Sequence, residues 1–138
     1  YYSGREKKRQ KTDKEFCADL GAWLGDDRPR AVVVDPSAAS FIAELRQAGY
    51  PVQQADNEVL DGIRNVSTRL QAGTLLFSAS CVHTAEEFQA YVWDEKAAER
   101  GEDKPVKVND HCMDAVRYFV TTILGRQVVR VGKRPARL

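Results

Sequence analysis

The first third of the chain alternates between two patterns of apolar residues. In residues 12–24 apolar side chains recur at helical intervals, at Phe16, Leu20, Trp23 and Leu24. This spacing predicts an amphipathic helix. Thr12, with Glu15 three positions later, has the spacing of a capping box at the start of that helix. Residues 31–35, "AVVVD", form a β-branched run without polar alternation, which predicts a strand buried on both faces, as parallel sheets have.

The strand and helix patterns then repeat along the chain. Ser37 can cap a helix over residues 38–49, which ends at a glycine, and residues 50–56 are short enough for a second strand. A helical apolar stripe follows in residues 57–73, and residues 74–80, "TLLFSAS", read as a third strand. Strands that alternate with helices in this way favour an α/β fold with neighbouring parallel strands, although the third strand could also pair antiparallel at an edge.

The last third is predicted to hold two helices separated by a polar loop. Residues 84–93 form the first, with Thr84 and Glu87 at capping-box spacing. Residues 94–110 are polar and contain breakers, so a loop or small hairpin is expected there. Residues 110–124 form the last helix, whose apolar residues are expected to face the core. They are Met113, Val116, Phe119, Val120, Ile123 and Leu124.

Length and cysteine content limit the class of protein. With 138 residues the chain has the size of one domain, and its apolar runs are too short to cross a bilayer, so we expect no membrane partner. The three cysteines form no CxxC pair, which argues against a disulfide framework and a cysteine zinc site. A reducing cytosol fits best.

Charge is distributed unevenly. Residues 1–11 hold five bases and one acid (+4), and residues 126–138 hold five bases and no acid (+5); since the whole chain carries +1, the middle carries −8. Such basic ends are either solvated tails or contacts for a polyphosphate partner.

Asp35 is the first candidate functional residue, because it stands at the carboxyl end of a predicted strand. In open α/β sheets, ligands bind beyond those ends. The alternative is that Asp35 only begins the turn "DPSA", because Asp-Pro-Ser is a good turn initiator.

A second group of candidates lies in residues 108–119, "VNDHCMDAVRYF". Asp110, His111 and Asp114 fall within one helical turn, and such oxygen and imidazole donors suit Mg²⁺ or Mn²⁺. The alternative is that Asn109 or Asp110 caps the helix and that Asp114 is favoured by the helix dipole, which leaves His111 unexplained. His83 is expected to be a surface residue. The chain has no Gly-rich phosphate loop, nucleophile elbow or HExxH motif, which excludes nucleoside-triphosphate, serine and zinc hydrolysis within it.

Three segments together resemble a known family. They are "VVVDPSAASFIAELRQAGYPV", "ADNEVLDGIRNVSTRL" and "EEFQAYVWDEKAAERGEDKPVKVNDHCMDAVRYF", and they resemble the carboxy-terminal nuclease domain of the tailed-phage terminase large subunit, including its prophage type. The resemblance implies a ribonuclease-H-like mixed sheet flanked by helices, in a nuclease that uses two divalent metals, Mg²⁺ or Mn²⁺, to cut concatemeric double-stranded DNA. It places Asp35 as the second metal ligand and His111 with Asp114, or Asp110 beside them, as the third.

The resemblance also implies partners and a location. They are double-stranded DNA, the terminase ATPase domain, the small subunit and the portal, in the cytoplasm of the host cell. The nuclease domain would cover residues 1–125, followed by a basic tail, 126–138. The expected phosphate contacts, independent of base sequence, come from the two basic ends: Arg5, Lys7, Lys8, Arg9, Lys11, Arg130, Lys133, Arg134 and Arg137.

The chain departs from that family at its start. "YYSGREKKRQKTD" resembles the end of the family's third strand, so the first two strands and the first metal-binding acid have no counterpart here. We therefore expect an N-terminally truncated domain that cleaves DNA poorly, because a two-metal site needs that acid. The strand that ends at Asp35 would have an unpaired apolar edge, so we expect the chain to self-associate through it, to rearrange its sheet, or to take the missing strands from a segment outside this sequence. The alternative is that "YYSGREK" pairs directly with the Asp35 strand and closes the gap. The alternative function is a non-catalytic α/β remnant or assembly module whose acids are caps and turns.

Overall fold

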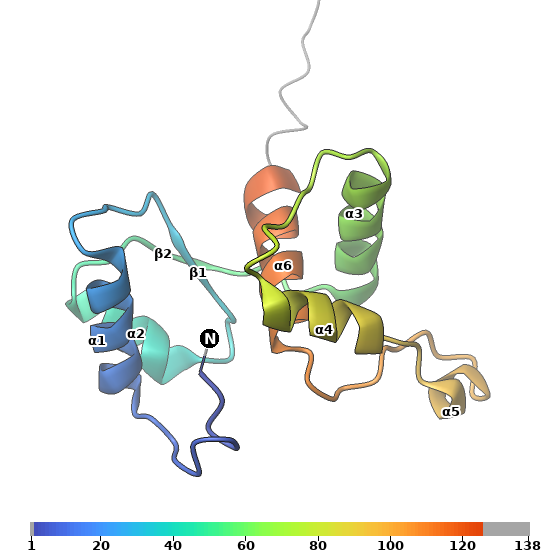
Figure 1. Ribbon diagram of the computed structural model, residues 1–138, viewed down its shortest axis with the longest axis horizontal. Coiled ribbons are helices and arrows are strands. Elements are labelled where there is room, and N and C mark those ends of the chain that lie inside the picture. The colour runs from blue at the N-terminus through green and yellow to red at the C-terminus, as the bar shows by residue number, and fades with distance from the viewer. Residues whose placement is uncertain (1, 126–138) are drawn as a thin grey trace, which may run out of the picture. The chain divides into compact units, whose positions relative to one another are not determined.

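The computed structural model describes residues 2–125 and divides the chain into two compact units, Tyr1–Ala55 and Asp56–Leu138. Each unit is considered by itself (Figure 1). The described residues mix helices with one small parallel sheet, as the alternating pattern of the sequence predicts.

The first unit contains two helices and the two-stranded sheet. Helix α1 (Asp13–Leu24) is followed by strand β1 (Val32–Val34), helix α2 (Ala39–Gln47) and strand β2 (Val52–Gln54). The strands run parallel, with Val33 opposite Gln53, so the predicted strand, helix and strand order is confirmed here. Cys17, Val34, Ile42 and Leu45 form the buried core of this unit.

The capping box predicted for α1 is present. The Thr12 hydroxyl accepts from the backbone N–H of Glu15, and the Glu15 carboxylate accepts from the backbone N–H of Thr12 at 2.8 Å. These hydrogen bonds, together with an ion pair to Arg9, lower the pKa of Glu15. Trp23, however, does not belong to the buried face of α1 as predicted, because it is 81% exposed. Ser37 is not the cap of α2, which has Ala38 at its N-cap without a side-chain hydrogen bond.

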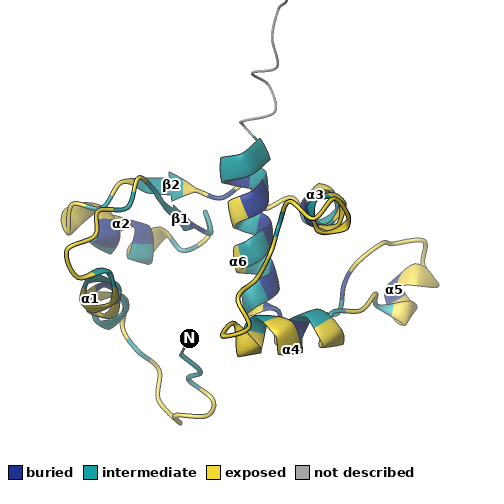
Figure 2. Cartoon of the chain, turned by 45° about the horizontal axis from the view of Figure 1, so that its top comes forward, coloured by how far each residue is buried: buried dark blue, intermediate teal, exposed yellow. Residues whose placement is uncertain are grey.

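The second unit is helical. Helix α3 (Val59–Gln71) and helix α4 (Val82–Ala90) both pack against helix α6 (His111–Phe119), which continues as a π-helical turn, η1 (Val120–Leu124). A short helix, α5 (Glu95–Ala98), lies in the long loop, closed at its base by an antiparallel bridge between Trp93 and Pro105. Figure 2 shows α6 buried or half-buried along most of its length, while α4 and α5 are largely exposed.

Residues 74–80 do not form the predicted third strand. Two backbone N–H groups, of Thr74 and Leu75, donate to the Arg69 carbonyl, so the segment turns back on the end of α3. Phe77 packs edge-on against Phe88 at 5.3 Å between ring centroids, and Leu76 is 83% exposed. The prediction of a strand from this apolar run is therefore wrong, because no strand lies beside residues 74–80 in the described part of the chain.

The capping box predicted at Thr84 is also wrong. Helix α4 begins two residues earlier, at Val82, and its N-cap Cys81 makes no side-chain hydrogen bond. The carboxylate of Glu87 binds elsewhere, at the start of α6. None of the helices among residues 2–125 is long and apolar enough to cross a membrane.

Candidate metal centre

Asp35 follows directly on β1 and begins a turn. Its Oδ1 accepts from the backbone N–H of Ser37 at 2.8 Å and from the Ser37 hydroxyl at 2.7 Å. The backbone N–H of Ala38 donates to the Asp35 carbonyl at 3.0 Å. The turn predicted from "DPSA" is therefore confirmed, and it holds a half-buried carboxylate at the carboxyl end of a parallel strand.

The first turn of α6 carries the other candidates. Asp110 is the N-cap residue, but its side chain makes no capping hydrogen bond, and Asn109 before it has a positive φ of 51°. The cap predicted from these two residues is therefore not formed. His111 is exposed, whereas Asp110 is 8% exposed.

Glu87 of α4 supplies the missing cap. Its Oε2 accepts from the backbone N–H groups of Cys112, at 2.6 Å, and Met113, at 3.2 Å. A buried carboxylate at this place satisfies two of the N–H groups that a helix start leaves unpaired and is favoured by the helix dipole. The turn that carries His111 and Asp114 is thereby fixed by a residue 25 positions away. Burial raises the pKa of the neighbouring Cys112 thiol.

Arg117 holds Asp114 and the start of α3 together. One guanidinium nitrogen donates to Asp114 Oδ1 at 2.5 Å, and the other donates to the carbonyls of Asn57, at 2.9 Å, and Glu58, at 3.1 Å. Arg117 is only 3% exposed, whereas Asp114 is half-buried, so the guanidinium is a buried part of the fold. One oxygen of Asp114 is thus committed to the protein, and only Oδ2 faces another cation.

That other cation is the ammonium group of Lys107. It lies 3.4 Å from Asp110 Oδ2 and 3.7 Å from Asp114 Oδ2. Asp110 Oδ2 is buried and accepts no hydrogen bond from the described residues. The carboxylates of Asp110 and Asp114 therefore both face the positive charge of Lys107.

The described residues do not complete a metal site by themselves. Among residues 2–125, no three His, Cys, Asp or Glu side chains lie together closely enough to hold an ion. Asp110, His111 and Asp114 belong to the second unit, and Asp35 belongs to the first. The ligand set predicted for the metal thus remains a prediction. His83 is exposed, as predicted, and pairs with Glu86 at 3.3 Å.

The basic residues expected to bind phosphate fall into three groups. Arg9 pairs with Glu15, and Lys11 pairs with Asp19 and lies 4.2 Å from the ring centroid of Tyr2. Arg5, Lys7 and Lys8 are exposed on the turn before α1. The tail bases lie outside the described residues; they are Arg130, Lys133, Arg134 and Arg137.

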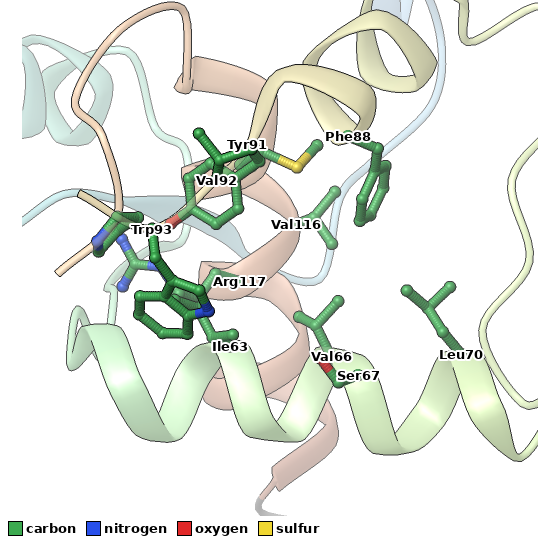
Figure 3. A pocket seen from close by; sticks show the side chains of 12 residues that line it. Ile63, Val66, Ser67, Leu70, Phe88, Tyr91, Val92, Trp93, Val116 and Arg117 are labelled. Carbon is green, nitrogen blue, oxygen red and sulfur yellow. The ribbon is translucent and has the colours of Figure 1, made fainter. Parts of the chain in front are cut away.

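An apolar cavity of about 270 Å³ also lies in the second unit, between α3, the end of α4 and α6 (Figure 3). Tyr91 and Arg117 line it, and the Tyr91 hydroxyl and Arg117 Nε are buried without a hydrogen-bond partner in the described part of the chain. Burial raises the pKa of the Tyr91 hydroxyl. The cavity includes none of the predicted metal ligands.

Three residues of this region were missed in the sequence, namely Glu87, Lys107 and Arg117. The spacing of Thr84 and Glu87 is visible in the sequence and predicts a cap at Thr84, whereas the Glu87 carboxylate caps α6. Arg117 stands three residues after Asp114, and Lys107 stands three before Asp110, so both ion pairs have a spacing that the sequence displays. Nothing in the sequence marks Arg117 as buried.

Solved structures of the large terminase from a thermophilic bacteriophage are similar to this chain. One crystal form is 57% identical with a TM-score of 0.85, and the match covers 89% of this chain and 32% of that chain. The complex of that terminase with ADP is 57% identical with a TM-score of 0.86, and the match covers 89% of this chain and 31% of that chain. This chain therefore spans about a third of the length of the terminases that it matches. No protein-family model and no curated protein matches it.

Proposed function

The chain is a relative of the large terminases of tailed phages, and from this premise we propose that it is a metal-dependent DNA endonuclease module with a ribonuclease-H-like fold. Its substrate is concatemeric double-stranded DNA during packaging. The observation that carries the proposal is the start of α6, where Asp110 and Asp114 both face the ammonium of Lys107 and the exposed His111 lies between them in the sequence.

The residues have distinct roles in this proposal. Asp35, on a turn at the end of β1, and Asp110 and His111, at the start of α6, provide oxygen and nitrogen ligands. Asp114 contributes only through Oδ2, because Arg117 holds its other oxygen. Mg²⁺ or Mn²⁺ held by these residues would help to activate water and to stabilise the leaving oxygen of the phosphodiester, and the first acid of the family's two-metal site has no counterpart among them.

DNA contacts in the proposal come from the exposed bases of the basic ends. Arg5, Lys7 and Lys8 are free of the ion pairs that engage Arg9 and Lys11, so they are the better phosphate contacts among the described residues. The segment 126–138 adds further bases. The ATPase domain, the small subunit and the portal are the proposed protein partners.

Metal titration tests the proposal directly. We expect Mn²⁺, added to the 138-residue chain and followed by calorimetry, to bind with a dissociation constant that rises roughly tenfold or more in Asp35→Asn and in His111→Ala, because each removes a metal ligand. Asp61→Asn is the matched control, since Asp61 is an exposed acid in the first turn of α3 and should bind Mn²⁺ like the parent chain.

The alternative is a non-catalytic module in which Asp35 is a turn residue and Asp114 is a structural partner of Arg117. Both of those contacts are present. No Mn²⁺ binding would exclude the metal centre and favour that alternative. Equal binding by Asp35→Asn and the parent chain would exclude Asp35 as a ligand.

A further inference from the structure

Lys107 pairs with two carboxylates at the start of α6, Asp110 and Asp114. Its ammonium lies 3.4 Å from Asp110 Oδ2 and 3.7 Å from Asp114 Oδ2. Asp110 and Asp114 are one helical turn apart, and like charges at this spacing repel each other. A cation between them removes the repulsion, and Lys107 supplies it in the described structure.

The two cations that contact these acids differ in how easily they can leave. Arg117 has 3% of its side chain exposed and is held by two backbone carbonyls as well as by Asp114. Lys107 has 59% of its side chain exposed, and its contacts with the two acids are ion pairs longer than 3.3 Å. A strongly hydrated ammonium on a flexible stem exchanges readily with solvent, whereas a buried guanidinium with several hydrogen bonds does not.

The Lys107 ammonium does not fully satisfy the buried carboxylate oxygen of Asp110. Asp110 is 8% exposed, and its buried Oδ2 has no hydrogen-bond donor among residues 2–125. A buried carboxylate oxygen without a donor is unfavourable unless a cation compensates it closely. A divalent ion at the normal ligand distance of about 2.1 Å would do so better than an ammonium at 3.4 Å.

We propose that Lys107 is an internal counter-ion of the metal centre, which neutralises Asp110 and Asp114 in the absence of metal and is displaced when Mg²⁺ or Mn²⁺ binds. Lys107 thereby sets the metal concentration at which the centre fills. This inference rests on the proposed function, because it takes both acids as metal ligands. Lys107 itself binds no metal and acts only on the affinity of the acids for the ion.

Mn²⁺ titration of Lys107→Gln tests the proposal, since glutamine removes the charge and keeps a polar side chain of similar reach. We expect Mn²⁺ to bind Lys107→Gln roughly three- to fivefold more tightly than the parent chain, the effect of removing a competing exposed ion pair. Binding is followed by calorimetry and by paramagnetic broadening of the amide signals of residues 110–114. Lys107→Arg keeps the charge and should retain the parent affinity within about twofold.

Lys104→Gln is the matched control. Lys104 lies in the same loop, is similarly exposed and pairs with Glu102 at 2.9 Å instead of with the α6 acids. Its substitution should leave Mn²⁺ affinity unchanged. Circular dichroism of each variant establishes that the helices are retained.

The outcomes separate this inference from the function on which it rests. If Mn²⁺ binds the parent chain and Lys107→Gln equally, or binds the variant more weakly, Lys107 is not a competing counter-ion, while the metal centre stands. If Mn²⁺ binds none of the four proteins, the metal centre is wrong and the counter-ion role is wrong with it. An equal gain in Lys104→Gln would indicate a general effect of net charge and also overturn the proposal.

Discussion

Glu87 connects two helices through a single carboxylate. It is 6% exposed, and its Oε2 accepts two backbone N–H groups of the first turn of α6. Capping is usually done by a residue next to the helix start, so a cap supplied by α4 ties the two helices together as well as satisfying the N–H groups. The position of His111 thus depends on Glu87 even though the two side chains belong to different helices.

Replacement of Glu87 is predicted to weaken the fold of the second unit. Glu87→Ala leaves two backbone N–H groups without their acceptor, so we expect a loss of about 1–3 kcal/mol in the free energy of unfolding, measured by urea denaturation. Glu87→Gln should lose less, because its amide oxygen can still accept. Glu86→Ala, at an exposed neighbouring position, should change stability by no more than about 0.5 kcal/mol. Equal losses of unfolding free energy in Glu87→Ala and Glu86→Ala would show that the cap does not stabilise the fold.

Residue-level prediction succeeded where the chemistry is local. The turn at Asp35 and the capping box at Thr12 each involve residues within three positions of one another, so the sequence displays the whole arrangement. Glu87 has the same local pattern with Thr84, but its carboxylate binds 25 residues away. A local pattern cannot indicate which of two competing helix starts a carboxylate will bind.

At the scale of elements, α3 and α6 approach closely at Gly62. This glycine is buried, and an added Cβ would clash with Cγ of Arg117 and lie 2.5 Å from its Cδ. Glycine is unfavourable in a helix by about 1 kcal/mol relative to alanine. Its presence here is explained by packing, because the stem of Arg117 crosses the helix at this point.

Gly62→Ala is predicted to destabilise the chain despite its better helix propensity. Arg117 cannot move aside without breaking its hydrogen bonds to Asn57, Glu58 and Asp114. We expect a net loss of roughly 1–2 kcal/mol in thermal or urea unfolding, since overpacking outweighs the gain in propensity. Asn65→Ala, at an exposed position of the same helix, should be neutral or slightly stabilising. In an Arg117→Ala background the cost of Gly62→Ala should disappear; its persistence there would exclude Arg117 as the cause.

Elements were predicted well where apolar periodicity and burial agree. The boundaries of α1, α2, α3 and the two strands lie within a few residues of those expected, because each buries part of the face that its pattern marks, although Trp23 in α1 and Leu70 in α3 are exposed. The strand prediction for residues 74–80 is wrong because an apolar run indicates only that a segment prefers burial. Whether it becomes a strand depends on a partner strand, and in the described chain Phe77 packs on Phe88 instead.

At the scale of the whole molecule, the outer edge of β1 is apolar and is not paired with another strand among the described residues. Val32 donates to the Pro51 carbonyl, and the Val34 carbonyl accepts from Ala55, so both residues direct their backbone groups toward β2. In a parallel ladder alternate residues face opposite edges, which places the N–H and C=O of Val33 at the other side of β1. Among the described residues no strand pairs with that side. An apolar strand with an open edge is a site for pairing with another chain.

The 138-residue chain is therefore predicted to self-associate through the open edge of β1. We expect the weight-average mass from light scattering to rise with protein concentration in the micromolar range. Val33→Pro removes the outward N–H but none of the bonds to β2, so it should reduce association and keep the helical circular dichroism signal. Gln53→Pro is the contrasting variant: Gln53 faces β1 across the ladder, so its loss should unfold the first unit instead. A monomeric mass at all concentrations, or association unchanged by Val33→Pro, would show that this edge is not the contact between chains.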